Sequence, residues 1–158
     1  MQEISTENFS QLDNRYKTTA IIYLAQIFST VILIVVALFF VEKSTGALDA
    51  ISLTALWTAV VFIAVAAFVL RRVFSRWERL KDIKLLKGTS GVFSALQSNA
   101  IILGALAETI TIIGFIITVL NGEKYDALRA GAVALIVFFI NFPRKSVWEK
   151  IVANLEKV

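Results

Sequence analysis

Residues 18–41 read TTAIIYLAQIFSTVILIVVALFFV, a stretch of 24 residues without a charged side chain. A helix needs about 20 apolar residues to cross the hydrocarbon of a bilayer, so this stretch predicts a membrane span. Three further stretches have the same character: 50–70, 98–122 with a single charged residue, and about 125–142 with two charges near its start. The sequence therefore predicts an all-α integral membrane protein with four transmembrane helices.

The composition agrees with this class and excludes several functions. Of the 158 residues, 58% are hydrophobic without counting glycine, whereas soluble domains have about 45–50% with glycine included. The chain has no cysteine, no histidine and one methionine, which excludes disulfides, thiolate zinc sites and catalysis by His or Cys. We therefore expect no enzymatic activity, no metal or cofactor, and no nucleic-acid partner.

The basic residues predict the orientation in the membrane. The segments before the first span, between the second and third spans, and after the fourth span together carry 13 Lys and Arg, whereas the other two loops carry 3. Loops rich in Lys and Arg stay in the cytoplasm. We therefore expect both termini and the middle loop to be cytoplasmic, in the cell inner membrane.

The spans divide the chain into five predicted parts. These are a cytoplasmic segment 1–17, a first hairpin 18–74, a basic loop or interfacial helix 75–97, a second hairpin 98–142 and an amphipathic tail helix 143–158. The pattern S-x-W-E-basic-aliphatic occurs at 75–80 and again at 146–151, and Ala-Ile-Ile occurs at 20–22 and 100–102. The two hairpins are either a duplication or alike by chance, because both membrane exits favour Trp and basic residues.

The tail has its apolar residues on one helical face, which is typical of a helix lying along the membrane surface. Trp77 and Trp148, the tryptophans of the repeated pattern, are the expected interfacial anchors. An alternative is that the basic loop and the tail form a docking surface for anionic lipid or for a soluble partner.

Small residues one helical turn apart indicate where helix backbones approach each other in a membrane. Such pairs occur on the last three spans, and we expect them to pack within the chain, against a second copy or against other membrane subunits. The pairs are Ala55 with Ala59, Ala100 with Gly104, and Ala127 with Gly131.

Glu108 lies near the middle of the third span, where an ionisable side chain is costly and needs a partner. Gln26 on the first span is at a comparable depth, and Thr109 is adjacent in sequence. A protonated Glu108 bonded to Gln26 would be a structural solution, and exchange of H⁺ or Na⁺ would be a functional one.

The run ILGALAET at 102–109, followed by IGFII at 113–117, resembles the ion-binding helix of the rotary ATP synthase proteolipid, the c subunit. The resemblance implies that Glu108 carries H⁺ or Na⁺ and that Gln26 and Thr109 correspond to the helper residues of sodium-type members. In that family the partner helix is rich in glycine, whereas neither of the first two spans here contains one. The whole chain also resembles small four-span bacterial membrane proteins.

Two functions are therefore predicted. The leading one is a non-enzymatic accessory or assembly subunit of a larger membrane complex. The alternative is a proteolipid-like subunit that binds or translocates H⁺ or Na⁺ through Glu108.

Overall fold

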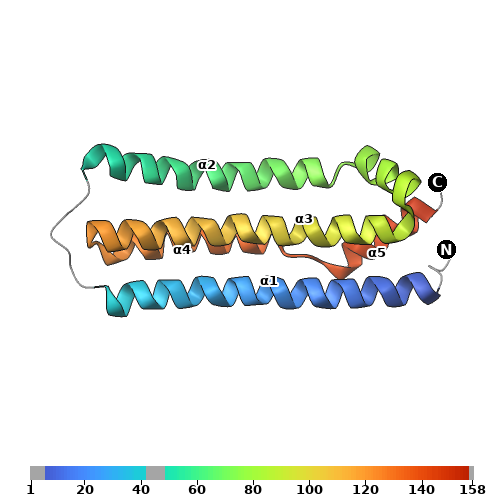
Figure 1. The fold of residues 1–158 in the computed structure, drawn as a ribbon, viewed down its shortest axis with the longest axis horizontal. Helices are drawn as coiled ribbons and strands as arrows, with labels where there is room; N and C mark the ends of the chain where they lie inside the picture. Colours follow the sequence, from blue (N-terminus) through green and yellow to red (C-terminus); the bar gives the residue numbers. More distant parts are fainter. Residues whose placement is uncertain (1–5, 42–48, 157–158) are drawn as a thin grey trace.

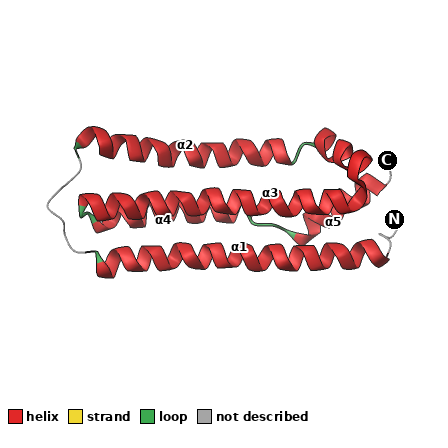
Figure 2. Ribbon diagram, viewed as in Figure 1, coloured by secondary structure: helices red, strands yellow, loops and turns green. Residues whose placement is uncertain are grey.

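The computed structural model describes residues 6–41 and 49–156, which form five helices and no strand (Figures 1 and 2). The helices are α1 (Thr6–Phe40), α2 (Ala50–Phe74), α3 (Trp77–Asn121), α4 (Lys124–Asn141) and α5 (Lys145–Glu156). The segments containing α1, α2, α3 and α4 are each long and apolar enough to cross a membrane. The prediction of an all-helical chain with four such helices is confirmed.

The second predicted hairpin forms the centre of the bundle. The antiparallel helices α3 and α4 lie between α1 and α2, which flank them on opposite sides (Figure 1). Helix α1 packs on both α3 and α4, and α2 packs mainly on α3. Among the described residues, α1 and α2 are not neighbours. The first hairpin, predicted over 18–74, is therefore continuous in sequence but is not a packed pair of helices.

Small residues allow the central helices to approach closely. A Cβ added to Gly114 on α3 would collide with the Cβ of Ala130 on α4. A Cβ added to Gly131 on α4 would collide with the side chain of Ile34 on α1. The absence of a side chain at these two positions thus allows α4 to lie close to α3 and to α1.

The turn between α3 and α4 is held by a glycine and by polar contacts. Gly122 has φ 73°, a left-handed conformation that ends α3. The backbone N–H of Ala127 donates to Oγ1 of Thr118 at 2.8 Å, which joins the two helix ends. Arg129 donates to the buried carboxylate of Asp126 at 3.3 Å, so the charges at the start of the fourth predicted span neutralise each other.

Two helices continue well beyond their apolar spans. Helix α1 has 35 residues, about 50 Å at 1.5 Å per residue, whereas the hydrocarbon core is about 30 Å thick. Helix α3 begins at Trp77 and crosses the predicted boundary between the basic loop and the second hairpin. It turns sharply at Gly88, whose φ of 66° and ψ of −170° are accessible essentially only to glycine.

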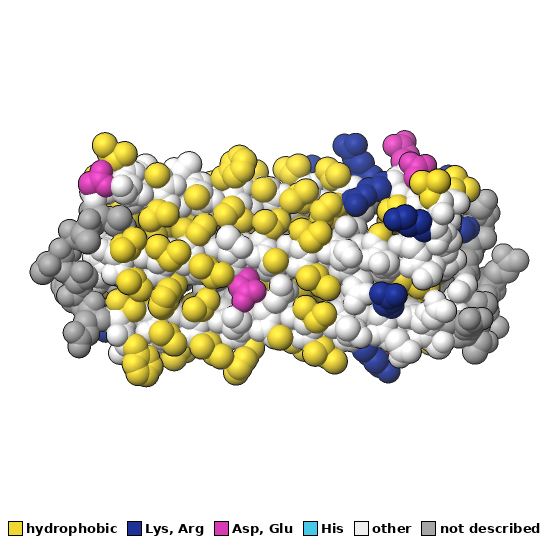
Figure 3. Space-filling model, viewed as in Figure 1, with side chains coloured by type: hydrophobic (Ala, Val, Ile, Leu, Met, Phe, Trp, Pro, Cys, Tyr) yellow, Lys and Arg dark blue, Asp and Glu magenta, His cyan; other side chains and the backbone are white. Residues whose placement is uncertain are grey.

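These extensions and α5 form the basic end of the molecule, which comprises residues 6–17, 75–97 and 143–156. The start of α1 and the end of α5 lie there (Figure 1), and Lys and Arg side chains gather toward it on the face in Figure 3. The basic end has its own apolar core, in which each of three helical segments contributes buried side chains. Its buried members are Leu12, Leu80, Val92, Phe93, Leu96, Trp148, Val152 and Leu155, together with Ala100 at the start of the adjoining span.

This second core corrects the predicted role of the tail. The apolar face of α5 was expected on the membrane surface, but Trp148 is 4% exposed and its ring meets Tyr16 edge-on at 5.8 Å. The correction has a physical cause: the extensions of α1 and α3 offer an apolar surface that α5 covers. Trp148 is therefore not available as a membrane anchor. Trp77 remains 37% exposed, with the Lys81 amine 5.8 Å from its ring centre.

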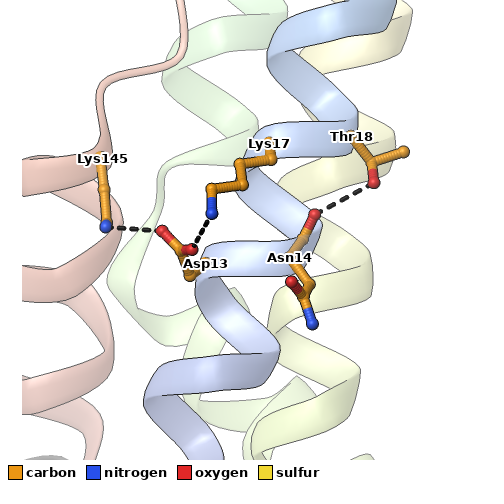
Figure 4. A network of polar contacts seen from close by, with 5 residues as sticks. All are labelled: Asp13, Asn14, Lys17, Thr18 and Lys145. Carbon is orange, nitrogen blue, oxygen red and sulfur yellow. Dashed lines mark hydrogen bonds and ion pairs between the residues drawn. The ribbon is translucent and has the colours of Figure 1, made fainter.

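Ion pairs fasten α5 to α1 at the edge of this core. The carboxylate of Asp13 accepts from Lys145 of α5 at 2.6 Å and from Lys17 at 2.7 Å (Figure 4). These contacts, chiefly the one with Lys145, lower the pKa of Asp13 below its usual value and raise the pKa of Lys145. Lys84 of α3 donates to the carbonyl of Leu155, so α5 is held from both sides.

Candidate functional site

Helix α1 approaches α3 closely at Gly104. A Cβ added to this glycine would collide with Oε1 of Gln26 and would lie 3.1 Å from Cε2 of Tyr23. Gly104, predicted as a packing residue, therefore lies against α1. We define the α1–α3 seam as this contact together with the residues that follow on the same helix faces: Tyr23, Gln26 and Thr30 on α1, and Gly104, Glu108 and Thr111 on α3.

Tyr23 anchors this seam to α4. Its side chain is fully buried, and its hydroxyl donates to the carbonyl of Phe138 at 3.2 Å. Its ring meets Phe138 and Phe142 edge-on, with ring centres 5.3 and 5.6 Å apart. Sequence reasoning missed Tyr23, although a lone Tyr within an apolar span is a signal, because a buried phenol needs a hydrogen-bond acceptor.

The seam contains buried oxygen atoms that have no hydrogen-bond partner. They are Oε1 of Gln26 and the hydroxyls of Thr30 and Thr111. Thr30 is 0% and Thr111 1% exposed. A buried polar group without a partner costs about 1–3 kcal/mol, so three of them along one interface are a concentrated cost.

Thr30 and Thr111 were not predicted, but their spacing was visible in the sequence. Thr30 follows Gln26 by one helical turn, and Thr111 follows Gly104 by two. Residues at these spacings lie on the same side of a helix. Once Gln26 and Gly104 are in contact, both hydroxyls therefore belong to the faces that α1 and α3 turn toward the bundle.

Glu108 lies at the outer edge of the same seam, one helical turn after Gly104. Its side chain is half-buried, and its carboxylate forms no hydrogen bond or ion pair with any described residue. Figure 3 shows that the middle of this face is mostly hydrophobic, with an acidic side chain among the apolar ones. The seam thus presents an unpartnered carboxyl group to its surroundings.

The three predicted ion-binding residues are only partly brought together. Gln26 contacts Gly104, and Glu108 follows Gly104 by one helical turn, but no hydrogen bond joins Gln26 to Glu108. The hydroxyl of Thr109 donates to the carbonyl of Ala105 at 2.8 Å, within its own helix. The hydroxyl nearest in sequence to Glu108 is therefore already used, whereas that of Thr111 is not.

The predicted packing pairs also divide into two groups. Ala100, Gly104, Ala127 and Gly131 are all buried inside the chain. On α2, Ala55 is exposed and Ala59 half-buried, and the surface around Ala55 is a shallow depression bordered by Thr54 and Thr58. Both hydroxyls donate to backbone carbonyls of α2 one turn earlier. No other described part of the chain covers this depression.

The described residues contain no group of three or more acidic, Cys or His side chains that could hold a metal ion. Comparisons with protein-family models, curated proteins and solved structures find no match to this chain.

Proposed function

We propose that the chain is a non-enzymatic integral membrane subunit that assembles with another membrane-embedded helix, from a second copy or a different subunit, against its α1–α3 seam. The single observation that supports this is the unpartnered, half-buried carboxyl group of Glu108. A charged residue at the middle of a bilayer costs about 2.5–3.5 kcal/mol on insertion scales. A donor from a neighbouring helix would remove this cost.

The orientation in this proposal places the basic end in the cytoplasm. The excess of Lys and Arg, 13 against 3, supports it, because loops near the spans follow the positive-inside rule. Both chain termini would then be cytoplasmic, in the cell inner membrane, and α5 would be a cytoplasmic helix.

The test is the size of the complex in mild detergent. We expect the wild type to migrate as an assembly and Glu108→Leu to migrate as a folded monomer, because leucine accepts no hydrogen bond. Glu108→Gln should keep the assembly, since an amide still accepts and donates. Ile136→Ala is the matched control: Ile136 is exposed on α4 at the depth of Glu108, since Gly114 faces Ala130 in this antiparallel pair. An assembly that survives Glu108→Leu would contradict the proposal.

The unpartnered oxygens of the seam favour one alternative, binding of H⁺ or Na⁺ beside Glu108. Gln26, Thr30 and Thr111 supply neutral oxygen ligands, and Glu108 supplies the charge. Under this alternative, sodium should protect Glu108 from a hydrophobic carbodiimide, which modifies protonated carboxyl groups. Thr111→Val should abolish the protection and Thr109→Val should retain it, because the Thr109 hydroxyl already bonds to Ala105. Labelling that sodium does not change would exclude the alternative.

A further inference from the structure

A second site lies where the apolar spans of α2 and α4 end. It is a pocket of about 390 Å³ between the end of α2, the middle of α3, the α4–α5 connection and α5. Because Phe74 ends α2 and Asn141 ends α4, the pocket lies at the boundary between the apolar spans and the basic end. In a membrane this level corresponds to the lipid headgroups.

The charged side chains of the pocket are all positive. Arg71 and Arg144 line it, and no acidic residue does. Neither guanidinium forms an ion pair with a described residue. Arg71 is held in place because it donates to the carbonyl of Ile140, and a guanidinium has five N–H donors, so most remain available. The pocket thus presents two uncompensated positive charges.

Two buried amides add polar groups with unused capacity. Asn99 is 8% exposed, and its side chain forms no hydrogen bond with a described residue. Asn141 is 7% exposed; its Nδ2 donates to the carbonyl of Val137 at 2.8 Å, while its Oδ1 has no partner. A buried amide oxygen is normally hydrogen-bonded, so Oδ1 of Asn141 points to a bound polar group, and the amide of Asn99, whose polar atoms are not fully buried, is available to the same group.

The remaining walls are apolar. Phe74 of α2, Leu103 of α3 and Ile140 of α4 line the side toward the spans, and Trp148 lines the side toward α5. A ligand that fits both halves has a negatively charged polar group and an apolar chain. A free phosphate ion would fill only the polar half.

We propose that this pocket binds the phosphate group of an anionic phospholipid, with Arg71, Arg144 and Asn99 donating to the phosphate oxygens and Asn141 accepting from a headgroup hydroxyl. Arginine is well suited to phosphate, because its planar donors match two phosphate oxygens. The acyl chains would leave along Phe74 and Leu103. In this way α5, the end of α2 and a lipid would form one unit at the membrane surface.

The experiment is native mass spectrometry of the full chain in detergent, titrated with phosphatidylglycerol, phosphatidylcholine and inorganic phosphate. We expect phosphatidylglycerol to bind at least about tenfold more tightly than phosphatidylcholine, because the choline group brings a positive charge beside Arg71 and Arg144 and has no hydroxyl for Asn141 to accept from. Arg144→Gln should remove most of this preference, and Asn99→Ala should weaken the binding of both lipids, because both carry the phosphate group. Neither side chain forms a hydrogen bond or ion pair with a described residue, so both variants should fold.

The matched control is Arg72→Gln. Arg72 is the exposed neighbour of Arg71 and does not line the pocket, so the preference should be unchanged. Equal binding of the two lipids, or an equal loss in Arg72→Gln and Arg144→Gln, would overturn the site. Displacement of phosphatidylglycerol by millimolar inorganic phosphate would contradict the proposal that the ligand is a lipid, and it would assign the pocket to a soluble phosphate.

Discussion

The helices of both hairpins are apolar enough to cross a membrane, but the two hairpins pack differently. In the apolar stretches of the segments containing α3 and α4, 44% of the residues are buried inside the chain, against 17% in α1 and 11% in α2. The central helices carry Gly104, Gly114 and Gly131 at contacts with their neighbours, whereas α1 and α2 contain no glycine. The difference teaches that apolar character alone does not determine which helices associate. The close contacts of the central helices instead occur where one of the two partners is a glycine.

The repeated S-x-W-E pattern sharpens this comparison, because its two tryptophans have different environments. Trp148→Ala should free the tail, since removing a buried aromatic side chain costs about 3–5 kcal/mol. Trypsin cleavage after Lys150 should accelerate at least about a hundredfold, because cleavage requires local opening of the tail. Trp77→Ala is the control, and it should leave this rate nearly unchanged because Trp77 is 37% exposed. Equal rates in the two variants would contradict the docked tail.

A second test compares a small residue buried between helices with a small residue on an exposed helix face. Gly114→Leu should destabilise the chain by about 1–3 kcal/mol or more, because its side chain collides with Ala130. Ala55→Leu on the exposed face of α2 should change the unfolding free energy by less than about 0.5 kcal/mol. Unfolding in mixed micelles with increasing SDS measures both. Similar losses would show that the small residues of α2 also pack within the chain.

A smaller effect is expected from pH at the basic end. The pKa of Asp13 is lowered by its contact with Lys145, so its contribution to tail docking is present above about pH 4 and is lost as the pH falls through the folded-state value. Trp148 fluorescence, in a chain whose other two tryptophans are Phe, should report this acid transition. Asp13→Asn should lack it, and Asp82→Asn, an exposed position, should retain it. A transition that persists in Asp13→Asn would assign it to another group.

Much of the fold follows from the sequence. Four long apolar stretches predict four helices, and the turn after α3 coincides with a glycine. The extension of α1 was missed because the first span was taken to begin after the charged residue Lys17, and the helix predicted over 75–97 was not expected to continue into the third span. Yet Leu12, Tyr16 and Tyr23 continue the buried face of α1 into its charged segment, at spacings of four and seven residues. Charge marks where a membrane span ends, whereas the helix ends where its apolar face no longer finds a partner.

The candidate site was predicted less completely. Glu108 and Gln26 stand out because polar residues are rare in apolar spans, and both border the seam. Thr30 and Thr111 do not stand out, since a threonine in a membrane helix commonly bonds to its own backbone, as Thr109 does. Which of the small-residue pairs packs within the chain depends on the arrangement of all four helices. The residues of one span do not by themselves show how the four helices are arranged.

The most direct test of the central proposal is photo-crosslinking in native membranes. A photoreactive residue at Ala105, exposed three residues before Glu108, is compared with one at Ile136, exposed on α4 at the same depth. The account predicts a defined protein adduct from position 105, to a second copy or another membrane subunit, and lipid adducts alone from position 136. Lipid adducts alone from both positions would contradict the proposal that another membrane helix covers the seam at Glu108.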